Sequence, residues 1–454
     1  MENKEEAKLT RTNIVSKNQI ISDLHIHSKY SRGCSTNLDI DNLEKYAKIK
    51  GVDLLGTGDF THPIWQKELK KKLINNDNTQ IPTTKSGFPF LYQTELSLIY
   101  SSNGKGRRIH NVVLAPSFDV VNQITDELKK RGRVDYDGRP IFKIPCPEFV
   151  EMLRSISKDI EVIPAHIWTP HFSLFGEYNQ FNTVEECFED QTKHIHALET
   201  GLSSDPPMNW RVSAIDRFNL VSFSDCHSYW PWRIGRESTI FNVKKLTYKN
   251  ILSAIRTPFT KGKKEGNFIS ETIEVNPSYG KYHLNGHRKC DVCLDPQKSK
   301  SLGHICPQCK KPVTIGVLQR VEELLDPSRP EGYKLKDAHP FRTLIPLHEI
   351  LSNLLNKGLA TKTVWTEYNN ISKLGSEFDI LLNKSKEELL QVCHEKIANA
   401  ILKNRTGQIE VKPGFDGEYG VPLFNASEKI LEVNKQKTPD KQKLQKKQKS
   451  LANF

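Results

Sequence analysis

In the stretch ISDLHIHS, residues 21–28, the polar residues Asp23, His25 and His27 alternate with Leu24 and Ile26. Residues at i, i+2 and i+4 of a strand project from the same face, so Asp23, His25 and His27 are expected to lie side by side at a strand end. Imidazole nitrogens bind zinc, iron or manganese, and a nearby carboxylate can orient such a ring. The stretch therefore predicts a metal site, with Asp23 as a candidate for orienting one of the histidines.

Side chains of the same kind recur beside other apolar runs. Asp225 and His227 in VSFSDCHS repeat the same-face spacing. Each such residue alone has an ordinary structural explanation, such as a buried histidine or a capping aspartate. Burying many ionisable groups in one domain is costly without a cation, so we interpret them together as ligands of one metal centre. The other candidate ligands are Asp59 in LLGTGDFTH, Glu95 in YQTELSLIY, His110 in RRIHNVVL and His166 in VIPAHIW.

The surrounding pattern predicts an α/β domain. Short β-rich runs alternate with segments of helical spacing, such as 43–50 and 147–157, which favours an α/β barrel or a layered sheet. Residues 344–355 predict an amphipathic helix, and the Gly- and Pro-rich segment 405–424 predicts turns with a short hairpin. We expect a flexible lead-in over 1–18, a metal-binding domain over 19–268, a linker with a cysteine module over 269–315, a helix-rich region over 316–432 and a disordered basic tail over 433–454.

Four of the nine cysteines form two CxxC pairs, Cys290 with Cys293 and Cys306 with Cys309. Two such pairs can hold one tetrahedral zinc ion, and four thiolates leave no open position for chemistry. We therefore predict one structural zinc site, in a chain kept in a reducing compartment. Lysines near both pairs favour contact with a nucleic acid backbone. The alternative is a module that only stabilises the fold and contacts no nucleic acid.

The net charge of +12 favours a polyanionic partner, and nucleic acid is the usual one. A generally basic enzyme is the alternative. The charged first residues do not resemble a signal peptide, and no run approaches the ~20 apolar residues of a membrane span. We expect a cytoplasmic monomer.

In this order, DLHIHS, the TGD segment, Glu95, the isolated histidines and SDCHS resemble the polymerase-and-histidinol-phosphatase (PHP) superfamily. The resemblance implies a distorted (β/α)7 barrel that binds two or three divalent metal ions at its strand ends, with zinc, manganese, iron or magnesium as candidates. It makes Glu95 the bridging ligand, and Asp59 stands where many members have a histidine. Arg32 and Gly33 replace a family aspartate or histidine, which leaves the third ion open, with Cys34 or His62 as substitutes. Glu199 is either an extra ligand or a salt-bridged carboxylate.

The order of PHP domain, zinc ribbon and helical region resembles the endonuclease Q family, most clearly in HIHSKYSRGCS, KIKGVDLLGTGDFTHP, ETGLSSDPPMNWR and SDCHSYWPWRIGRE. The resemblance implies a DNA repair enzyme that nicks on the 5′ side of a deaminated base (hypoxanthine, uracil or xanthine) or of an abasic site. Asp225, Glu95 and Arg32 are the catalytic candidates, with Arg32 neutralising a phosphate or forming a surface salt bridge. The alternatives are a small-molecule phosphomonoesterase and a DNA- or clamp-binding scaffold with a decayed site.

An enzyme of this kind must extrude the damaged nucleotide and hold it against aromatic faces. Aromatic and basic residues beside the motifs are therefore candidates for DNA contact, with core packing as the alternative for each tryptophan. These candidates are Trp168, Trp210, Arg211, Tyr229, Trp230, Trp232 and Arg233.

The last seven residues, QKSLANF, place Gln448, Leu451 and Phe454 at the spacing QxxLxxF. This spacing resembles the motif by which repair proteins dock on the sliding clamp (PCNA). Seven lysines between Lys435 and Lys449 favour DNA or an acidic clamp surface. The expected partners are damaged DNA and the clamp, in the nucleoid.

Overall fold

Seven strands enclose the predicted metal-binding region. The structure, a computed structural model, describes residues 18–258 and 266–424. The strands are β1 (Gln19–Asp23), β2 (Leu54–Gly56), β3 (Phe90–Ser102), β4 (Lys105–Ala115), β6 (Glu161–Pro164), β7 (Ala197–Glu199) and β8 (Asn219–Val221). The first five pair in the order β1-β2-β3-β4-β6, and β7 pairs with β8. The Ile167 N–H donates to Glu199 C=O at 3.0 Å, and a parallel bridge joins Ile26 to Cys226, so the sheet curls into a ring.

Among these seven strands, β4 alone runs against the others. It is antiparallel to both β3 and β6, whereas β1, β2 and β3 are parallel. The cause is the tight turn between β3 and β4, where Asn103 and Gly104 have φ of 51° and 73°. Positive φ at both central residues is the geometry of hairpin turns that match the strand twist. The expected distorted α/β barrel is therefore confirmed, and its distortion comes from this hairpin.

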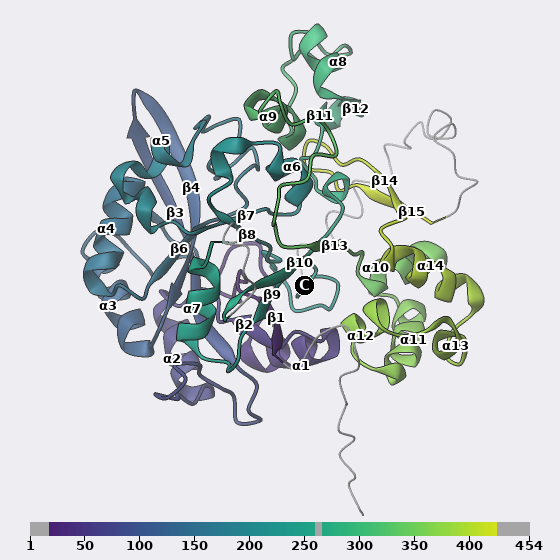
Figure 1. Cartoon of the computed structure of the whole chain (residues 1–454), viewed down its shortest axis with the longest axis horizontal. Coiled ribbons are helices and arrows are strands. Elements are labelled where there is room, and N and C mark those ends of the chain that lie inside the picture. Colours follow the sequence, from purple (N-terminus) through teal and green to yellow (C-terminus); the bar gives the residue numbers. More distant parts are fainter. Residues whose placement is uncertain (1–17, 259–265, 425–454) are drawn as a thin grey trace, which may run out of the picture.

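Helices cover the outside of the ring (Figure 1). Helix α1 begins after Asp39, whose side chain accepts from the Asn42 N–H, and ends at Gly51 in the left-handed conformation. Its buried face includes Leu43 and Ala47, which pack into the main core. The helices expected at 43–50 and 147–157 are both present. The outer helices are α1 (Ile40–Lys50), α2 (Pro63–Lys72), α3 (Phe118–Lys129), α4 (Cys146–Ile156), α5 (Val184–Phe188), α6 (Pro206–Trp210) and α7 (Tyr248–Arg256).

Further strands extend the sheet beyond the ring: β9 (Ser238–Asn242), β10 (Phe268–Glu274) and β13 (Phe341–Thr343) follow β1 in that order, and β5 (Ile141–Phe142) pairs with β3. The cysteine module contains β11 (Asn285–His287), β12 (Val292–Leu294) and α8 (Pro296–Ser301), and α9 (Val317–Leu324) follows it. Short 3-10 helices are η1 (Glu189–His194), η2 (Ser213–Ile215), η4 (Pro277–Tyr279), η5 (Arg288–Cys290) and η6 (Ser372–Leu374).

The last helices form a group beside the barrel (Figure 1). They are α10 (Leu347–Leu354), α11 (Lys362–Ile371), α12 (Glu377–Leu382), α13 (Lys386–Leu390) and α14 (Glu395–Arg405), followed by the hairpin of β14 (Glu410–Lys412) and β15 (Val421–Leu423). The expected amphipathic helix near 344–355 and the hairpin within 405–424 are therefore present. Within the described residues, no helix is long and apolar enough to cross a membrane.

A buried ion pair joins the barrel to this helical group. Lys50, the last residue of α1, places its Nζ 2.6 Å from Glu377 Oε1, and both side chains are almost fully buried. The same Nζ donates to Pro231 C=O at 3.0 Å. Beside it, the rings of Trp230 and Trp232 stack at 5.2 Å, and both lie against Trp365 of α11. The loop that follows the Asp225–His227 segment is thus held by the helical group.

Candidate metal centre

Four side chains converge inside the barrel: His25 and His27 follow β1, Glu95 lies within β3, and Asp225 follows β8. The ligand atoms of His25, His27, Glu95 and Asp225 all lie within 4.8 Å of one another. Nε2 of His27 is 3.0 Å from Asp225 Oδ1 and 3.5 Å from Glu95 Oε2. Nε2 of His25 is 3.5 Å from Glu95 Oε1 and 3.6 Å from Asp225 Oδ1. Two imidazoles and two carboxylates form a donor set that suits a divalent transition metal.

A second cluster shares one residue with the first. Glu95, His110 and His166 also bring their ligand atoms within 4.8 Å of one another. Glu95 Oε1 lies 2.6 Å from His110 Nδ1 and 3.3 Å from His166 Nε2. Because Glu95 belongs to both clusters, its carboxylate stands where one group would bridge two metal ions. Within the described residues the barrel holds no third such cluster, so neither Cys34 nor His62 completes one.

Backbone strain accompanies the clustering. Asp59, His166 and Asp225 have φ of 44°, 30° and 46°, in the turns that follow β2, β6 and β8. Left-handed backbone costs a non-glycine residue of order 1–3 kcal/mol and persists where the surrounding structure over-determines it. Neighbouring glycines make room: a Cβ on Gly58 would lie 2.8 Å from the His27 carbonyl carbon, and one on Gly201 would lie 2.6 Å from the Cβ of His166.

Each of the two candidate ligand histidines that follow β1 has its remote nitrogen fixed by a neighbour. Nδ1 of His25 lies 2.8 Å from Glu199 Oε1, and Nδ1 of His27 lies 3.1 Å from Asp59 Oδ1. Ionised carboxylates only accept hydrogen bonds, so each ring donates from Nδ1 and directs its Nε2 toward the cluster. Such carboxylate–histidine pairs fix the tautomer and raise the basicity of a metal-binding histidine. Glu199 therefore orients His25 in this structure. This contact favours the salt-bridged carboxylate over the extra ligand, the two roles considered for Glu199.

Asp59 differs from its expected role as a ligand. It lies behind His27, on the opposite side of the ring from Glu95 and Asp225, and its second oxygen accepts from the Ser28 N–H at 2.7 Å and from Ser31 Oγ at 3.0 Å. With both oxygens occupied, Asp59 holds a histidine in place and does not face the ligand atoms.

Asp23 also differs from the prediction, because it orients no histidine. Its carboxylate accepts from the Ser224 backbone N–H at 3.0 Å, from Ser224 Oγ at 2.5 Å and from the Gly235 N–H at 2.9 Å. Arg236 donates to the Ser224 carbonyl from the other direction at 3.1 Å. Together these contacts hold the turn that presents Asp225.

Two other expected site residues lie apart from the clusters. His227 is outside both sets: its ring lies 4.7 Å from that of His27, and its Nδ1 donates to the Asp225 carbonyl at 2.9 Å. Arg32 also differs from its expected role at the phosphate. Its side chain is 78% exposed and pairs with Asp137, with Nε 3.4 Å from Oδ2. It reaches solvent and not the metal centre.

Arg139, and not Arg32, is the arginine that lies beside the clusters. Its Nη1 lies 3.2 Å from Glu95 Oε2, and its side chain is only 21% exposed. Burial alone would lower the pKa of this guanidinium, but Glu95 and Asp225 outweigh burial and raise it, so the group is a fixed positive charge. Arg139 follows no recognisable motif; only the fold brings the 137–139 turn, where Gly138 packs against Asp59, to this site.

The electrostatics of the centre fit bound cations. Burial would raise the pKa of Glu95, but His110, His25 and Arg139 hold it well below the usual range. Burial would likewise lower the pKa of His27, whereas Asp225 and Asp59 raise it to about 9. Three buried atoms that face one another have no hydrogen-bond partner of acceptable geometry: His25 Nε2, Glu95 Oε1 and His110 Nδ1. Buried polar atoms are rarely left so, and metal ions would satisfy all three.

A pocket of about 200 Å³ opens beside the clusters. Its walls combine the site residues His110, His166, Asp225 and Arg139 with the side chains of Phe172, Phe223, Leu202, Lys281 and Tyr282, among others. The pocket is therefore polar on its metal-facing side and largely apolar elsewhere.

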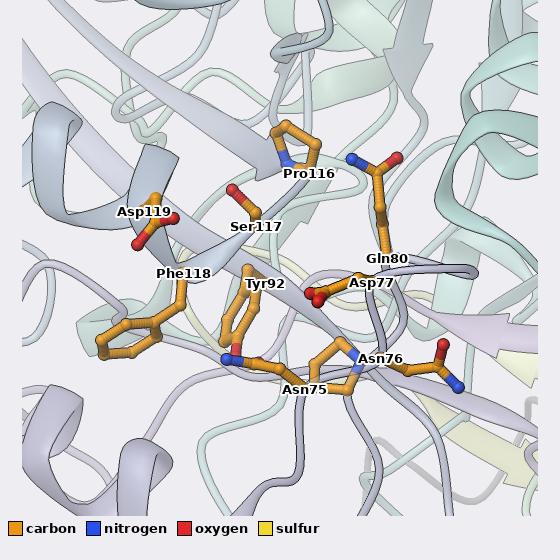
Figure 2. A pocket seen from close by; sticks show the side chains of 10 residues that line it. Asn75, Asn76, Asp77, Gln80, Tyr92, Pro116, Ser117, Phe118 and Asp119 are labelled. Atoms are coloured by element: carbon orange, nitrogen blue, oxygen red, sulfur yellow. The ribbon is translucent and has the colours of Figure 1, made fainter.

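A second pocket, of about 180 Å³, shares no residue with this one. Figure 2 shows Asp77, Gln80 and Ser117 around it, with Tyr92 at its wall. The Tyr92 hydroxyl donates to Asn75 Oδ1 at 2.6 Å. No histidine or cysteine lines this pocket, so it lacks the donor set of the metal centre.

Three tryptophans proposed for DNA contact lie in the core. Trp168, Trp210 and Trp232 are 1%, 6% and 5% exposed, so each is a packing residue and not a contact surface. Trp168 Nε1 also donates to Asn209 Oδ1 at 2.8 Å. The remaining candidates, Arg211, Tyr229, Trp230 and Arg233, are half-buried. Gln448, Leu451 and Phe454 lie outside the described residues.

The cysteine module gathers a different set of ligands from the one expected. His287, Cys290, Cys306 and Cys309 bring their ligand atoms within 4.8 Å of one another. Cys293 is exposed and lies outside this set. The expected cysteine-rich module is thus present, but a histidine stands where the fourth thiol was predicted.

Known proteins resemble this chain over part of its length and over nearly all of it. Residues 346–408 match the family model described as the MJ0043 C-terminal domain. Over 262 residues the chain is 35% identical to the uncharacterized protein MJ0043 of Methanocaldococcus jannaschii, an alignment that covers 57% of this chain and 31% of that relative. The matched part therefore spans less than a third of that longer protein.

Two solved structures resemble nearly the whole chain. One is the lesion-specific endonuclease PfuEndoQ from Pyrococcus furiosus, at 31% identity and a TM-score of 0.79, covering 92% of this chain and 99% of that one. The other is endonuclease Q in complex with a 27-mer duplex substrate with an abasic lesion at the active site. It is 32% identical with a TM-score of 0.79, covering 92% of this chain and all of that one.

We predict that Asp59→Asn weakens metal binding without unfolding the chain. The change removes the negative charge behind His27 but keeps the size of the side chain, and loss of such a partner typically costs 10–100-fold in metal affinity. Competition with a chelator measures the affinity, and Asp41→Asn, at an exposed ion pair with Lys72, is the matched control. Equal affinities in both variants would contradict the role given to Asp59.

Proposed function

Because the chain belongs to the endonuclease Q family, we propose that it is a metal-dependent DNA repair endonuclease that nicks the phosphodiester on the 5′ side of a deaminated base or an abasic site. The observation that carries the proposal is the position of Glu95 in two ligand clusters at once. Support for a lesion as substrate comes from the related endonuclease Q bound to a duplex with an abasic lesion. The net charge of +12 favours association with DNA. We propose that the protein acts as a monomer in the nucleoid.

The chain's own residues suit phosphodiester hydrolysis. His25, His27 and Asp225 would hold one divalent ion, His110 and His166 a second, and Glu95 would contact both. Zinc is our first candidate, with manganese, iron and magnesium as alternatives. Two divalent ions at one site orient a phosphodiester, lower the pKa of water and stabilise the leaving oxygen. No serine or cysteine nucleophile is needed.

Arg139 supplies the positive charge that the protein itself brings to the phosphate. Its guanidinium lies on the Oε2 side of Glu95 and lines the pocket next to Asp225. A guanidinium matches the geometry of phosphate oxygens and stays charged at all physiological pH values. We propose that Arg139 contacts the scissile phosphate and stabilises charge that develops on it.

The pocket beside the clusters is our candidate for the extruded nucleotide. At about 200 Å³ it is smaller than the roughly 300–1,000 Å³ of pockets for drug-sized ligands, so a single base is the appropriate size class. Phe172, Phe223 and Tyr282 supply apolar and aromatic walls, and His171, which also lines the pocket, stacks on the exposed Tyr178 at 4.6 Å. Extrusion costs least at mismatched or damaged bases, which provides one source of selectivity.

We predict that the wild-type protein nicks labelled duplexes containing hypoxanthine, uracil, xanthine or an abasic site, and leaves the undamaged duplex intact. Asp225→Ala removes a ligand of the first cluster and should abolish nicking while leaving DNA binding measurable. Cleavage of a phosphomonoester without DNA cleavage would support the phosphatase alternative. Metal-loaded protein that binds DNA but cleaves nothing would support the decayed scaffold.

Substitution of each arginine in turn distinguishes the proposed catalytic role of Arg139 from the surface position of Arg32. We expect Arg139→Ala to lower kcat by about 10²–10³-fold, the usual cost of losing one group that stabilises transition-state charge. Arg139→Lys should recover part of the rate, and Arg32→Ala should stay close to wild type because that side chain reaches solvent. Metal content is measured in parallel, so a rate change without a metal change identifies phosphate contact. A wild-type rate for Arg139→Ala would remove this residue from the mechanism.

The tail supports a further partner, the sliding clamp, through Gln448, Leu451 and Phe454. We predict that deletion of residues 448–454 abolishes binding to purified clamp in a surface-binding assay, whereas nicking of a short lesion duplex continues at the wild-type rate. Replacing only Leu451 and Phe454 with alanine should have the same effect without shortening the chain. Undiminished clamp binding by both variants would contradict the assignment.

A further inference from the structure

The cysteine module offers five candidate ligands for a tetrahedral zinc ion, and its backbone distinguishes among them. The candidates are His287, Cys290, Cys293, Cys306 and Cys309. The sequence HRKCDVC contains two overlapping patterns with the same spacing, His-x2-Cys and Cys-x2-Cys. Only one of these patterns can match the turn formed by the second pair.

The second pair defines the geometry of that turn. The Cys306 N–H donates to the Lys311 carbonyl at 2.8 Å, and the Lys310 N–H donates to the Cys306 carbonyl at 3.0 Å. Lys310, directly after Cys309, has φ of 61°. One position further out, Ile305 bridges Pro312 in antiparallel fashion. The turn therefore consists of a first ligand, two intervening residues, a second ligand and a residue in the left-handed conformation. A backbone contact between the first ligand and the residue five positions later closes the turn.

The first turn repeats this geometry with His287 as its first ligand. His287 pairs with Val292, five positions later, across β11 and β12. Asp291, directly after Cys290, has φ of 51°. One position further out, Gly286 pairs with Cys293, as Ile305 does with Pro312. His287 and Cys290 thus stand where Cys306 and Cys309 stand in the second turn, and Cys293 corresponds to Pro312, outside the ligand positions.

Side-chain placement agrees with the backbone. His287 Nδ1 lies 3.4 Å from Cys309 Sγ. On β12, Val292 packs into the small core with Cys306 and Val313. Neighbouring residues of a strand point to opposite faces, so Cys293 points away from that core and is exposed. The four-thiolate site implied by the two CxxC pairs therefore does not fit this fold.

We infer that the structural zinc is bound by His287, Cys290, Cys306 and Cys309, and that Cys293 is a free, solvent-accessible thiol. A three-thiolate, one-imidazole set is an established tetrahedral zinc site. It carries one negative charge less than a four-thiolate site. Because the module's apolar core is small, its folding depends on this ion.

Cobalt substitution of the full-length protein tests the ligand set. The thiolate-to-cobalt absorption band grows with the number of bound thiolates, and the barrel clusters contribute nothing because they hold only histidines and carboxylates. We expect Cys293→Ser to leave the band unchanged, and His287→Cys to raise it by about a third, from three thiolates to four. Loss of about a quarter of the band in Cys293→Ser, with no increase in His287→Cys, would overturn the inference.

Alkylation of the unmodified protein provides a test that needs no variant. Iodoacetamide treatment of the zinc-loaded chain, followed by mass spectrometry, should label Cys293 rapidly and leave Cys290, Cys306 and Cys309 protected until a chelator is added. Protection of Cys293 together with the other three would show four thiolates on the ion and would contradict the assignment of His287.

Discussion

One buried carboxylate organises the centre of this protein. Glu95 is fully buried, and its two oxygens face four imidazoles and the guanidinium of Arg139. An isolated charge in such a place would cost several kcal/mol, so it persists only among positive partners. The register of the β3–β4 hairpin supplies one of them directly: Glu95 pairs with Val112, which makes His110 its diagonal neighbour across the hairpin. The same hairpin therefore both distorts the barrel and brings a candidate ligand of the second cluster to the first.

Around Glu95, the fold fixes the orientation of the histidine rings as well as the positions of the histidines in the chain. Glu199 and Asp59 each accept a hydrogen bond from a candidate ligand histidine, and Asp23 with Arg236 holds the turn that carries Asp225. These supporting groups explain how strained, left-handed turns can be kept in one conformation. A pre-set ligand geometry reduces the reorganisation required when ions and substrate bind.

The sequence predicted which segments meet, and it was weaker on what each side chain does there. Same-face alternation predicted that His25 and His27 lie together, and the positions of Glu95, His166 and Asp225 in or beside other apolar runs led to one centre. The direction in which a carboxylate faces depends on packing between distant segments, which periodicity does not report. Asp59 was for that reason expected among the ligands, and Arg139 was missed because it lies in a turn without a motif. His287 was overlooked because two overlapping spacings compete in HRKCDVC.

The contact between Lys50 and Glu377 has a consequence for how the chain can evolve. A carboxylate and an ammonium group buried together tolerate no independent loss, because either one left alone would be an uncompensated charge in the interior. The aromatic contacts of Trp230 and Trp232 with Trp365 add a second mutual dependence beside it. Exchanging the helical group for another domain would therefore require simultaneous changes on both sides of this contact.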